Sequence, residues 1–269
     1  MKDLDTRWLY IVLVLAILAP MLRPIGIPLK IGTWTKTVYD YVEKLNAGEV
    51  VLICSDYTAS TDNEIGSIRE AMVKQLLKRN VKAVLIAFNS QGVPFSQRIT
   101  AMYEKAGKTY GTDVVDLGYL AGGEKALTSF FADIKKSTGK DARGTATDSL
   151  PILKNIKTLS EIRLIIEMAS GVPGPAEYIR QIATYGTPIV FGLSSGLMSS
   201  ATVYMQSKQS IGIVPGLQGG AEYEKLTGEF GYATSAMDSQ SLAYLTYIAA
   251  IVLGNAIHFT SKKKPRSKV

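Results

Sequence analysis

Cysteine and histidine are almost absent from this chain. Its 269 residues include one of each, Cys54 and His258. A single cysteine cannot form an intrachain disulfide or a cysteine-built metal site, and His258 lies in a long apolar segment near the end of the sequence. The remainder therefore lacks the histidine that triad hydrolases and most zinc sites require. Cys54 belongs to the apolar run 50–54, which predicts a buried structural thiol.

Complete nucleotide-binding motifs are also missing. The chain contains neither G-x-G-x-x-G nor G-x-x-x-x-G-K-[ST]. Asp56, Asp62 and Glu64 are near one another in sequence and offer carboxylates for a cation. Glu64, however, is expected to form a T-x-x-E capping box with Thr61 at the start of a helix, and Asp62 suits the first turn of that helix. We therefore expect neither a metal nor a cofactor.

Negative charge is scarce at the two ends of the chain, where most of the excess positive charge lies. The formal net charge is +7, of which about +6 lies outside residues 24–240 and about +1 within them. A nucleic-acid groove needs cations clustered along one face of the domain, so we expect no nucleic-acid partner. The basic residues of the C-terminal tail, 262–269, are Lys262, Lys263, Lys264, Arg266 and Lys268.

Two apolar segments bracket the chain. The first, Trp8–Leu22, lies in a predicted anchor over residues 1–23, and the second is a predicted helix over residues 241–261. A spanning helix needs about 20 apolar residues. The first segment also resembles a signal peptide, but Pro20 disrupts the best cleavage site. We therefore predict two transmembrane helices that flank a domain at residues 24–240.

The basic tail predicts the orientation, because Lys and Arg accumulate on the cytoplasmic side of spanning helices. Two spans then place both termini in the cytoplasm and the domain on the opposite face. Ala250 and Gly254 form a small-xxx-small pair, which lets another helix approach closely. The expected partners are therefore the bilayer and either further copies of this chain, as a homo-oligomer, or another membrane protein. Asp238 is expected to cap the second helix.

Between the two anchors, apolar runs rich in β-branched residues alternate with stretches of helical periodicity. This alternation predicts a mostly parallel sheet with helices on both faces, an α/β fold of Rossmann-like type. The predicted strands are residues 50–54, 81–88, 113–117, 162–168, 188–193 and 211–214.

The domain divides into two similar halves, at about residues 33–140 and 147–236. A helix is predicted before the first strand of each, at residues 39–45 and 150–159. Equivalent strands lead into similar turns in the same order, which indicates a tandem duplication of a three-stranded unit. Chance similarity is the alternative, because glycine and serine are common at such turns. The paired turns are Ser90-Gln-Gly92 with Ser194-Ser-Gly196, and Gly122-Gly123 with Gly219-Gly220.

Ligands of open α/β sheets bind beyond the carboxyl ends of the strands, where the strand order reverses. Small residues at helix N-termini expose amide groups there that can hold an anion, although tight strand-to-helix turns are the better explanation of the glycine pairs. The candidate ligand-binding residues at this edge are Ser55, Asp56, Asn89, Ser90, Gly92, Gly122, Gly123, Ser194, Ser195, Gly196, Gly219 and Gly220.

One local stretch resembles a known family. Residues 81–92, which end in Asn89-Ser90-Gln-Gly92, look like the strand and N-S-x-G turn of membrane-anchored signal peptide peptidases and related Clp-type serine proteases. Residues 187–192 followed by Ser195–Ser200 resemble their strand leading to the nucleophilic serine. The resemblance implies a Ser-Lys dyad using Ser90, Ser195 or Ser199. The chain departs from the family at the paired glycines of the first turn and at the nucleophile turn.

Three functions follow from these observations. The first is a non-enzymatic, membrane-anchored α/β protein that assembles laterally or binds a partner or ligand at the membrane surface. The second is a serine hydrolase with a Ser-Lys dyad, as the resemblance implies. The third is a sensor that holds an anion or nucleotide-type ligand at the glycine turns. The absence of a complete catalytic motif favours the first.

Overall fold

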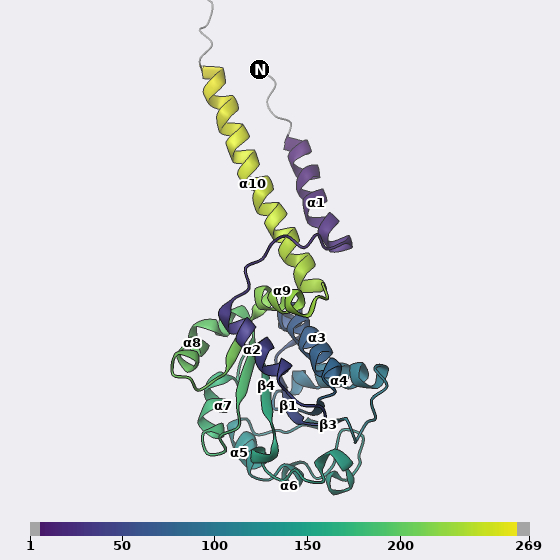
Figure 1. The fold of residues 1–269 in the computed structure, drawn as a ribbon. Coiled ribbons are helices and arrows are strands. Elements are labelled where there is room, and N and C mark those ends of the chain that lie inside the picture. The colour runs from purple at the N-terminus through teal and green to yellow at the C-terminus, as the bar shows by residue number, and fades with distance from the viewer. Residues whose placement is uncertain (1–5, 263–269) are drawn as a thin grey trace, which may run out of the picture. The chain divides into compact units, whose positions relative to one another are not determined.

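A computed structural model describes the backbone of residues 6–262 and the side chains of residues 7–260. The expected basic tail therefore lies almost wholly outside the described residues, as does the start of the predicted N-terminal anchor. The chain forms two compact units, labelled by element in Figure 1. One is the α/β unit, Lys30–Glu229, and the other combines the segments before and after it.

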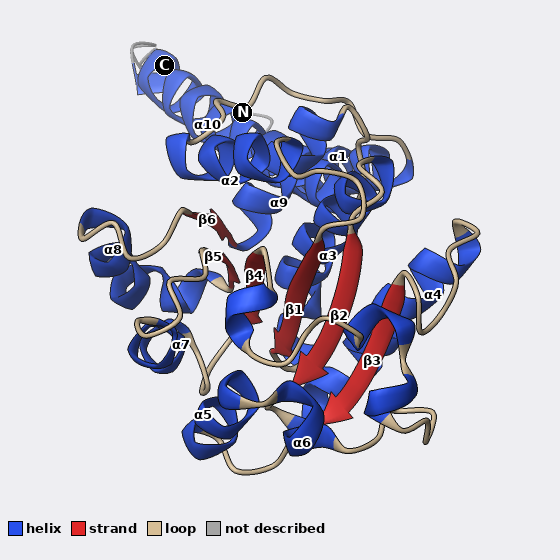
Figure 2. Cartoon of the chain, turned by 60° about the horizontal axis from the view of Figure 1, so that its bottom comes forward, coloured by secondary structure: helices blue, strands red, loops and turns tan. Residues whose placement is uncertain are grey.

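The α/β unit contains a six-stranded sheet in which every pairing is parallel. The strand order is β3-β2-β1-β4-β5-β6 (Figure 2). All six predicted strands are confirmed, because strands covered on both faces leave the continuous apolar runs that the sequence shows. Their bounds are β1 Val50–Asp56, β2 Lys82–Ala87, β3 Val114–Tyr119, β4 Leu164–Ala169, β5 Ile189–Leu193 and β6 Gly212–Pro215.

Helices cover both faces of the sheet, as predicted, and each face has its own apolar core. Alternate residues of β1 separate the cores: Leu52 and Cys54 face one, and Val51 and Ile53 the other. Helices α2 Thr33–Glu43, α3 Asp62–Lys78, α4 Val93–Lys105 and α9 Gly216–Thr227 contribute to the second core. Helices α5 Glu124–Ala132, α6 Ile134–Thr138, α7 Pro175–Ile182 and α8 Met198–Gln206 contribute to the first.

Two local predictions in this unit are wrong. The helix expected at residues 150–159 is instead a pair of 3-10 turns, Pro151–Leu153 and Leu159–Glu161. The capping box expected at α3 does not form, because the Thr61 hydroxyl donates to the carbonyl of Thr58 at 3.0 Å. The Glu64 carboxylate is bound elsewhere by a residue distant in sequence.

The second unit contains α1, Thr6–Leu22, packed against α10, Tyr232–Lys262. By length and composition, one helix in the described part of the chain can cross a membrane: Tyr232–Thr260, with a mean hydropathy of 1.6. The apolar helix Arg7–Leu22 is shorter than that criterion requires. The second predicted span is thus present as a helix of sufficient length, whereas the first falls short.

Asp238 does not cap α10, contrary to the prediction, because the helix begins at Tyr232 and Asp238 lies in its second turn. Its carboxylate instead accepts three backbone N–H bonds from the segment that follows α1. Ile25 and Gly26 donate to one oxygen, both at 2.8 Å, and Ile27 donates to the other at 2.9 Å. Asp238 therefore joins the two segments that make up this unit.

Candidate functional site

The strand order of the α/β unit reverses between β1 and β4. From this centre β2 and β3 extend to one side and β5 and β6 to the other. This is the order of dinucleotide-binding Rossmann domains, whose ligands bind at the carboxyl ends of the central strands. The predicted site residues at the ends of β1, β2 and β5 share this edge, because parallel strands end on the same side of a sheet.

Asp56 is the last residue of β1 and is fully buried. One carboxylate oxygen accepts the N–H groups of Phe88 and Asn89 at 2.6 and 2.9 Å, and the other accepts the Tyr178 hydroxyl at 2.7 Å. Burial raises the pKa of Asp56 to about 7, although these hydrogen bonds oppose the shift. Asp56 thus ties β1 to the end of β2 and to α7.

A second acid lies close to Asp56 in the same core. Glu167, in the middle of β4, is fully buried, and neither carboxylate oxygen has a hydrogen-bond partner in the described structure. Its neighbour in register on β1 is Cys54. Burial, and then the charge of Asp56, raise the pKa of Glu167 well above its ordinary value. Cys54 is buried, as predicted, and this burial raises the pKa of its thiol.

Ser195 and Glu64, 131 positions apart in sequence, are in direct contact at this edge. The Ser195 N–H and hydroxyl both donate to one oxygen of Glu64, at 2.8 and 2.7 Å. Gly216, the first residue of α9, leaves room for this contact, because a Cβ there would lie 2.3 Å from the Ser195 hydroxyl oxygen. This contact joins α3 to the turn after β5.

The arrangement gives no geometric support to a Ser-Lys dyad. Ser195 directs its hydroxyl to a carboxylate, and Ser90 and Ser199 are exposed. Within the described side chains, no lysine forms a hydrogen bond with any of these three serines. In the described structure, the three serines therefore lack the lysine base that the resemblance implies.

Two of the remaining candidate residues, Gly92 and Asn89, have structural explanations. Gly92 must lack a side chain, because a Cβ there would lie 1.6 Å from the Ser55 carbonyl oxygen. The Ser55 hydroxyl is buried without a hydrogen-bond partner in the described structure. Asn89 accepts the Gln91 N–H and caps a short turn. Ser194 is buried, and Gly196 is exposed with open space around it.

The two glycine pairs, expected to be equivalent turns, differ in structure. Gly122 and Gly123 precede α5 with φ of +127° and +56°, values that favour glycine. Gly219 and Gly220 lie inside α9, so the turn expected there is not formed. A Cβ on Gly219 would lie 2.4 Å from Pro215. Glycine is therefore needed here because α9 packs closely against the end of β6, the strand that precedes it.

A buried arginine beside this edge was not predicted from the sequence. The Arg69 guanidinium donates to the Tyr57 hydroxyl at 2.5 Å and to Asp62 at 2.8 Å. Arg98 reaches the other Asp62 oxygen at 2.5 Å, and the Phe95 ring stacks on Tyr57 at 4.1 Å between centroids. Burial opposes ionisation of Asp62, but the hydrogen bonds from the two arginines keep its pKa below the usual value. Asp62 therefore serves an ion-pair network.

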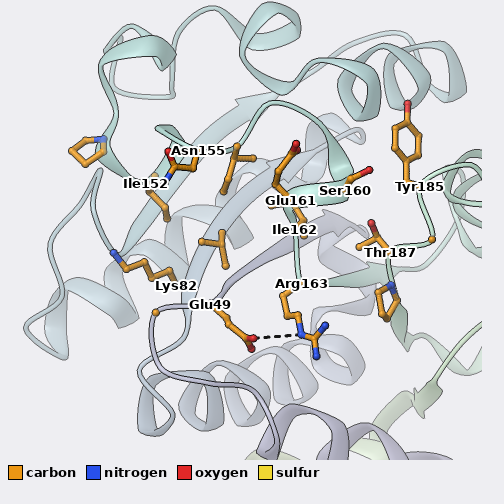
Figure 3. A pocket seen from close by; sticks show the side chains of 16 residues that line it. Glu49, Lys82, Ile152, Asn155, Ser160, Glu161, Ile162, Arg163, Tyr185 and Thr187 are labelled. Atoms are coloured by element: carbon orange, nitrogen blue, oxygen red, sulfur yellow. Dashed lines mark ion pairs between the residues drawn. The ribbon is translucent and has the colours of Figure 1, made fainter.

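A cavity of about 570 Å³ lies at the opposite, amino edge of the sheet. Figure 3 shows Glu49 and Arg163 joined across 3.5 Å, with Lys82 on the neighbouring strand directed away from that pair. No motif singled out this region, because its lining comes from six separate segments. In the described part of the chain, no group of three or more His, Cys, Asp or Glu residues could hold a metal ion.

Comparisons with known proteins do not place the chain in a family. No family model matches it, and no curated protein matches it. Among solved structures, it is similar to the C-terminal domain of a group 1 family glycosyl transferase from Francisella tularensis. The match has 11% sequence identity and a TM-score of 0.29, and covers 76% of this chain and 96% of that one. Similarity at this level carries no functional argument.

Proposed function

We propose that this chain is a membrane-tethered, non-catalytic α/β protein that assembles laterally through α10. The observation that carries the proposal is the apolar surface of that helix. None of its most apolar 18-residue window is buried within the structure, and its exposed side chains include Leu245, Ile248, Ile251 and Phe259. A continuous apolar surface of this kind needs lipid or protein to cover it.

The length of α10 suits a membrane span. Its candidate span, Tyr232–Thr260, has 29 residues and extends about 43 Å at 1.5 Å per residue, against a hydrocarbon core of about 30 Å. The 17 residues of α1 reach only about 25 Å. We propose that α1 nevertheless forms a second span beside α10, with local thinning of the bilayer accommodating its shorter length.

The proposed topology rests on the sequence of the basic tail. Lysine and arginine at residues 262–268 favour a cytoplasmic C-terminus. With two spans the N-terminus is then cytoplasmic as well, and the α/β unit lies on the opposite face of the membrane. The same cations are suited to contact anionic lipid headgroups.

The small residues of α10 supply the proposed assembly surface. A Cβ added to Gly254 would meet nothing within 4 Å, so this face of the helix is open. Ala250 and Gly254 also border an apolar groove of about 550 Å³ between α1 and α10, lined on the other side by Trp8, Leu9 and Val12. A helix from a second copy can approach closely at such small residues, where dispersion contacts favour association.

Measuring the oligomeric state tests this proposal. In mild detergent, the intact protein is expected to form a discrete oligomer by light scattering. The double variant Ala250→Leu, Gly254→Leu should weaken self-association at least about tenfold, a loss of about 1.4 kcal/mol. Val252→Phe is the matched control, because it adds bulk about 200° around the helix from Ala250 and should leave the oligomer intact. A monomeric wild-type protein, or an oligomer insensitive to the double variant, would refute lateral assembly through this face.

We further propose that the α/β unit arose by tandem duplication. The order β3-β2-β1-β4-β5-β6 supports this, because the two halves run outward from a common centre. The helices that follow β1 and β2 cover one face, and those that follow β4 and β5 cover the other. Right-handed crossovers produce this alternation when the same unit is repeated about that centre.

A further inference from the structure

The cavity at the amino edge of the sheet is formed by the N-terminal ends of strands and by the neighbouring loops. Val50 pairs in register with Lys82, and the Arg163 N–H donates to the Val50 carbonyl, so the three residues lie side by side on β2, β1 and the approach to β4. Two loops, 151–156 and 185–188, complete the lining. The volume of about 570 Å³ lies in the range of small-molecule sites.

Several polar groups around this cavity are free to bind a ligand. Arg163 uses its Nε atom to contact Glu49 at 3.5 Å, and neither of its Nη atoms has a partner among the described residues. Its side chain is 56% exposed. Asn155, Ser160 and Tyr185 are also lining residues (Figure 3), and the Asn155 amide and the hydroxyls of Ser160 and Tyr185 form no hydrogen bond with the described side chains or backbone.

The other charged groups in the lining already have partners. Lys82 donates to the Thr112 carbonyl at 2.9 Å and lies 3.8 Å from Asp113. One oxygen of Glu161 accepts the N–H and hydroxyl of Thr158 at 2.7 and 2.8 Å. Among the described lining residues, Arg163 is therefore the cation that remains available to a ligand. One positive charge suits a ligand with a single negative charge better than a phosphate dianion.

The remaining lining is apolar. Ile152, Ile156 and Ile162 are nearly completely buried, and Pro151 and Pro188 lie beside them. A bound molecule would thus meet a guanidinium fork and neutral polar groups together with aliphatic side chains. The planar Nη pair of arginine matches the two oxygens of a carboxylate.

We propose that the amino-edge cavity binds a small monocarboxylate with an apolar body, with Arg163 holding the carboxylate. This site lies at the edge of the sheet opposite the usual Rossmann ligand site, and it does not depend on membrane assembly. Asn155, Ser160 and Tyr185 position the polar part of the molecule, and the isoleucines contact its apolar part.

Thermal unfolding of the intact protein in nanodiscs tests this proposal with defined probes. The carboxylates are hexanoate, N-acetyl-leucine and N-acetyl-phenylalanine, and the controls are the amide N-acetyl-leucinamide and inorganic phosphate. We expect a saturable rise in Tm with at least one carboxylate, because a ligand that binds only the folded state stabilises it. The amide should give no such rise. Phosphate that binds as well as the carboxylates would contradict the assignment of ligand class.

Variants then test the residue. Arg163→Gln should weaken binding of the carboxylate at least about tenfold, as expected when a charged hydrogen bond is lost. Glu49→Gln removes the same ion pair but retains the guanidinium, so it should bind at least as well as wild type. Arg180→Gln removes an equally exposed arginine outside the cavity and should have no effect. Absence of saturable binding by every carboxylate, or binding unchanged by Arg163→Gln, would overturn the proposal.

Discussion

At the scale of single residues, the neighbouring buried acids Asp56 and Glu167 are expected to make the stability of this protein depend on pH. They lie on neighbouring central strands, in the core that also contains Cys54 and Tyr178. Because burial disfavours the charged form of a carboxyl group, both acids hold their protons to higher pH than free acids do, and the charge of Asp56 adds to this effect at Glu167. The folded state therefore binds more protons than the unfolded chain near neutral pH.

This proton uptake predicts that stability falls as pH rises. For Asp56, the pKa is 3.8 for the free acid and about 7 in the fold. Its contribution is fully present below the unfolded pKa and is lost as pH rises toward 7. A shift of this size corresponds to about 4 kcal/mol, as an upper order of magnitude. Urea unfolding of the intact protein at pH 5 and pH 8 measures the part of this loss that falls between pH 5 and 7, about 3 kcal/mol.

The variant Asp56→Asn is the control for that pH dependence. The Asn carbonyl can still accept the N–H groups of Phe88 and Asn89, while its amide can donate to the Tyr178 oxygen. Asp56→Asn should therefore fold and show a flatter dependence of stability on pH between 5 and 8. Wild-type stability that rises with pH over this interval would contradict the account.

The sequence predicted the strands well and the contacts of single polar residues poorly. Continuous apolar runs located all six strands because each strand is buried on both faces. The proposed cap of Glu64 on Thr61 was wrong because Ser195, 131 positions away, competes successfully for the carboxylate. The sequence shows Glu167 as an acid inside an apolar strand. That it lies near Asp56, however, can be inferred only once the strand order is known.

At the scale of elements, Asp238 holds the segment after α1 to α10. Its side chain receives three N–H bonds, from Ile25, Gly26 and Ile27, and Ser239 beside it donates to the Ile17 carbonyl at 2.8 Å. The helix N-cap rule could not find this role. The carboxylate serves a loop more than 200 residues earlier in the chain, and sequence proximity to a helix start favoured the local interpretation.

We predict that Asp238→Ala separates these two segments. Hydrogen bonds to a charged group contribute about 1.5–3 kcal/mol each, although three on one carboxylate are not additive. The variant should lower the Tm of the detergent-solubilised protein and speed proteolysis within residues 23–31. Ser241→Ala, which removes a hydroxyl bonded only to its own helix, is the matched control. Unchanged cleavage in Asp238→Ala would show that other contacts hold the loop.

At the scale of the whole molecule, the two units differ in how many of their apolar side chains are exposed. The sheet unit buries its apolar side chains in two cores, whereas α1 and α10 expose theirs along most of their length. The sequence predicted this contrast because a spanning helix and a buried strand leave different apolar patterns. It did not predict the amino-edge cavity, whose lining is assembled from separate loops by the fold.

Extraction of native membranes with alkaline carbonate tests the central claim most directly. The protein is produced at low level, and its distribution between pellet and supernatant is measured by immunoblot beside a known spanning protein and a known peripheral one. An anchor that crosses the bilayer predicts that the chain stays in the pellet with the spanning protein. Release into the supernatant with the peripheral protein would contradict membrane tethering by α10.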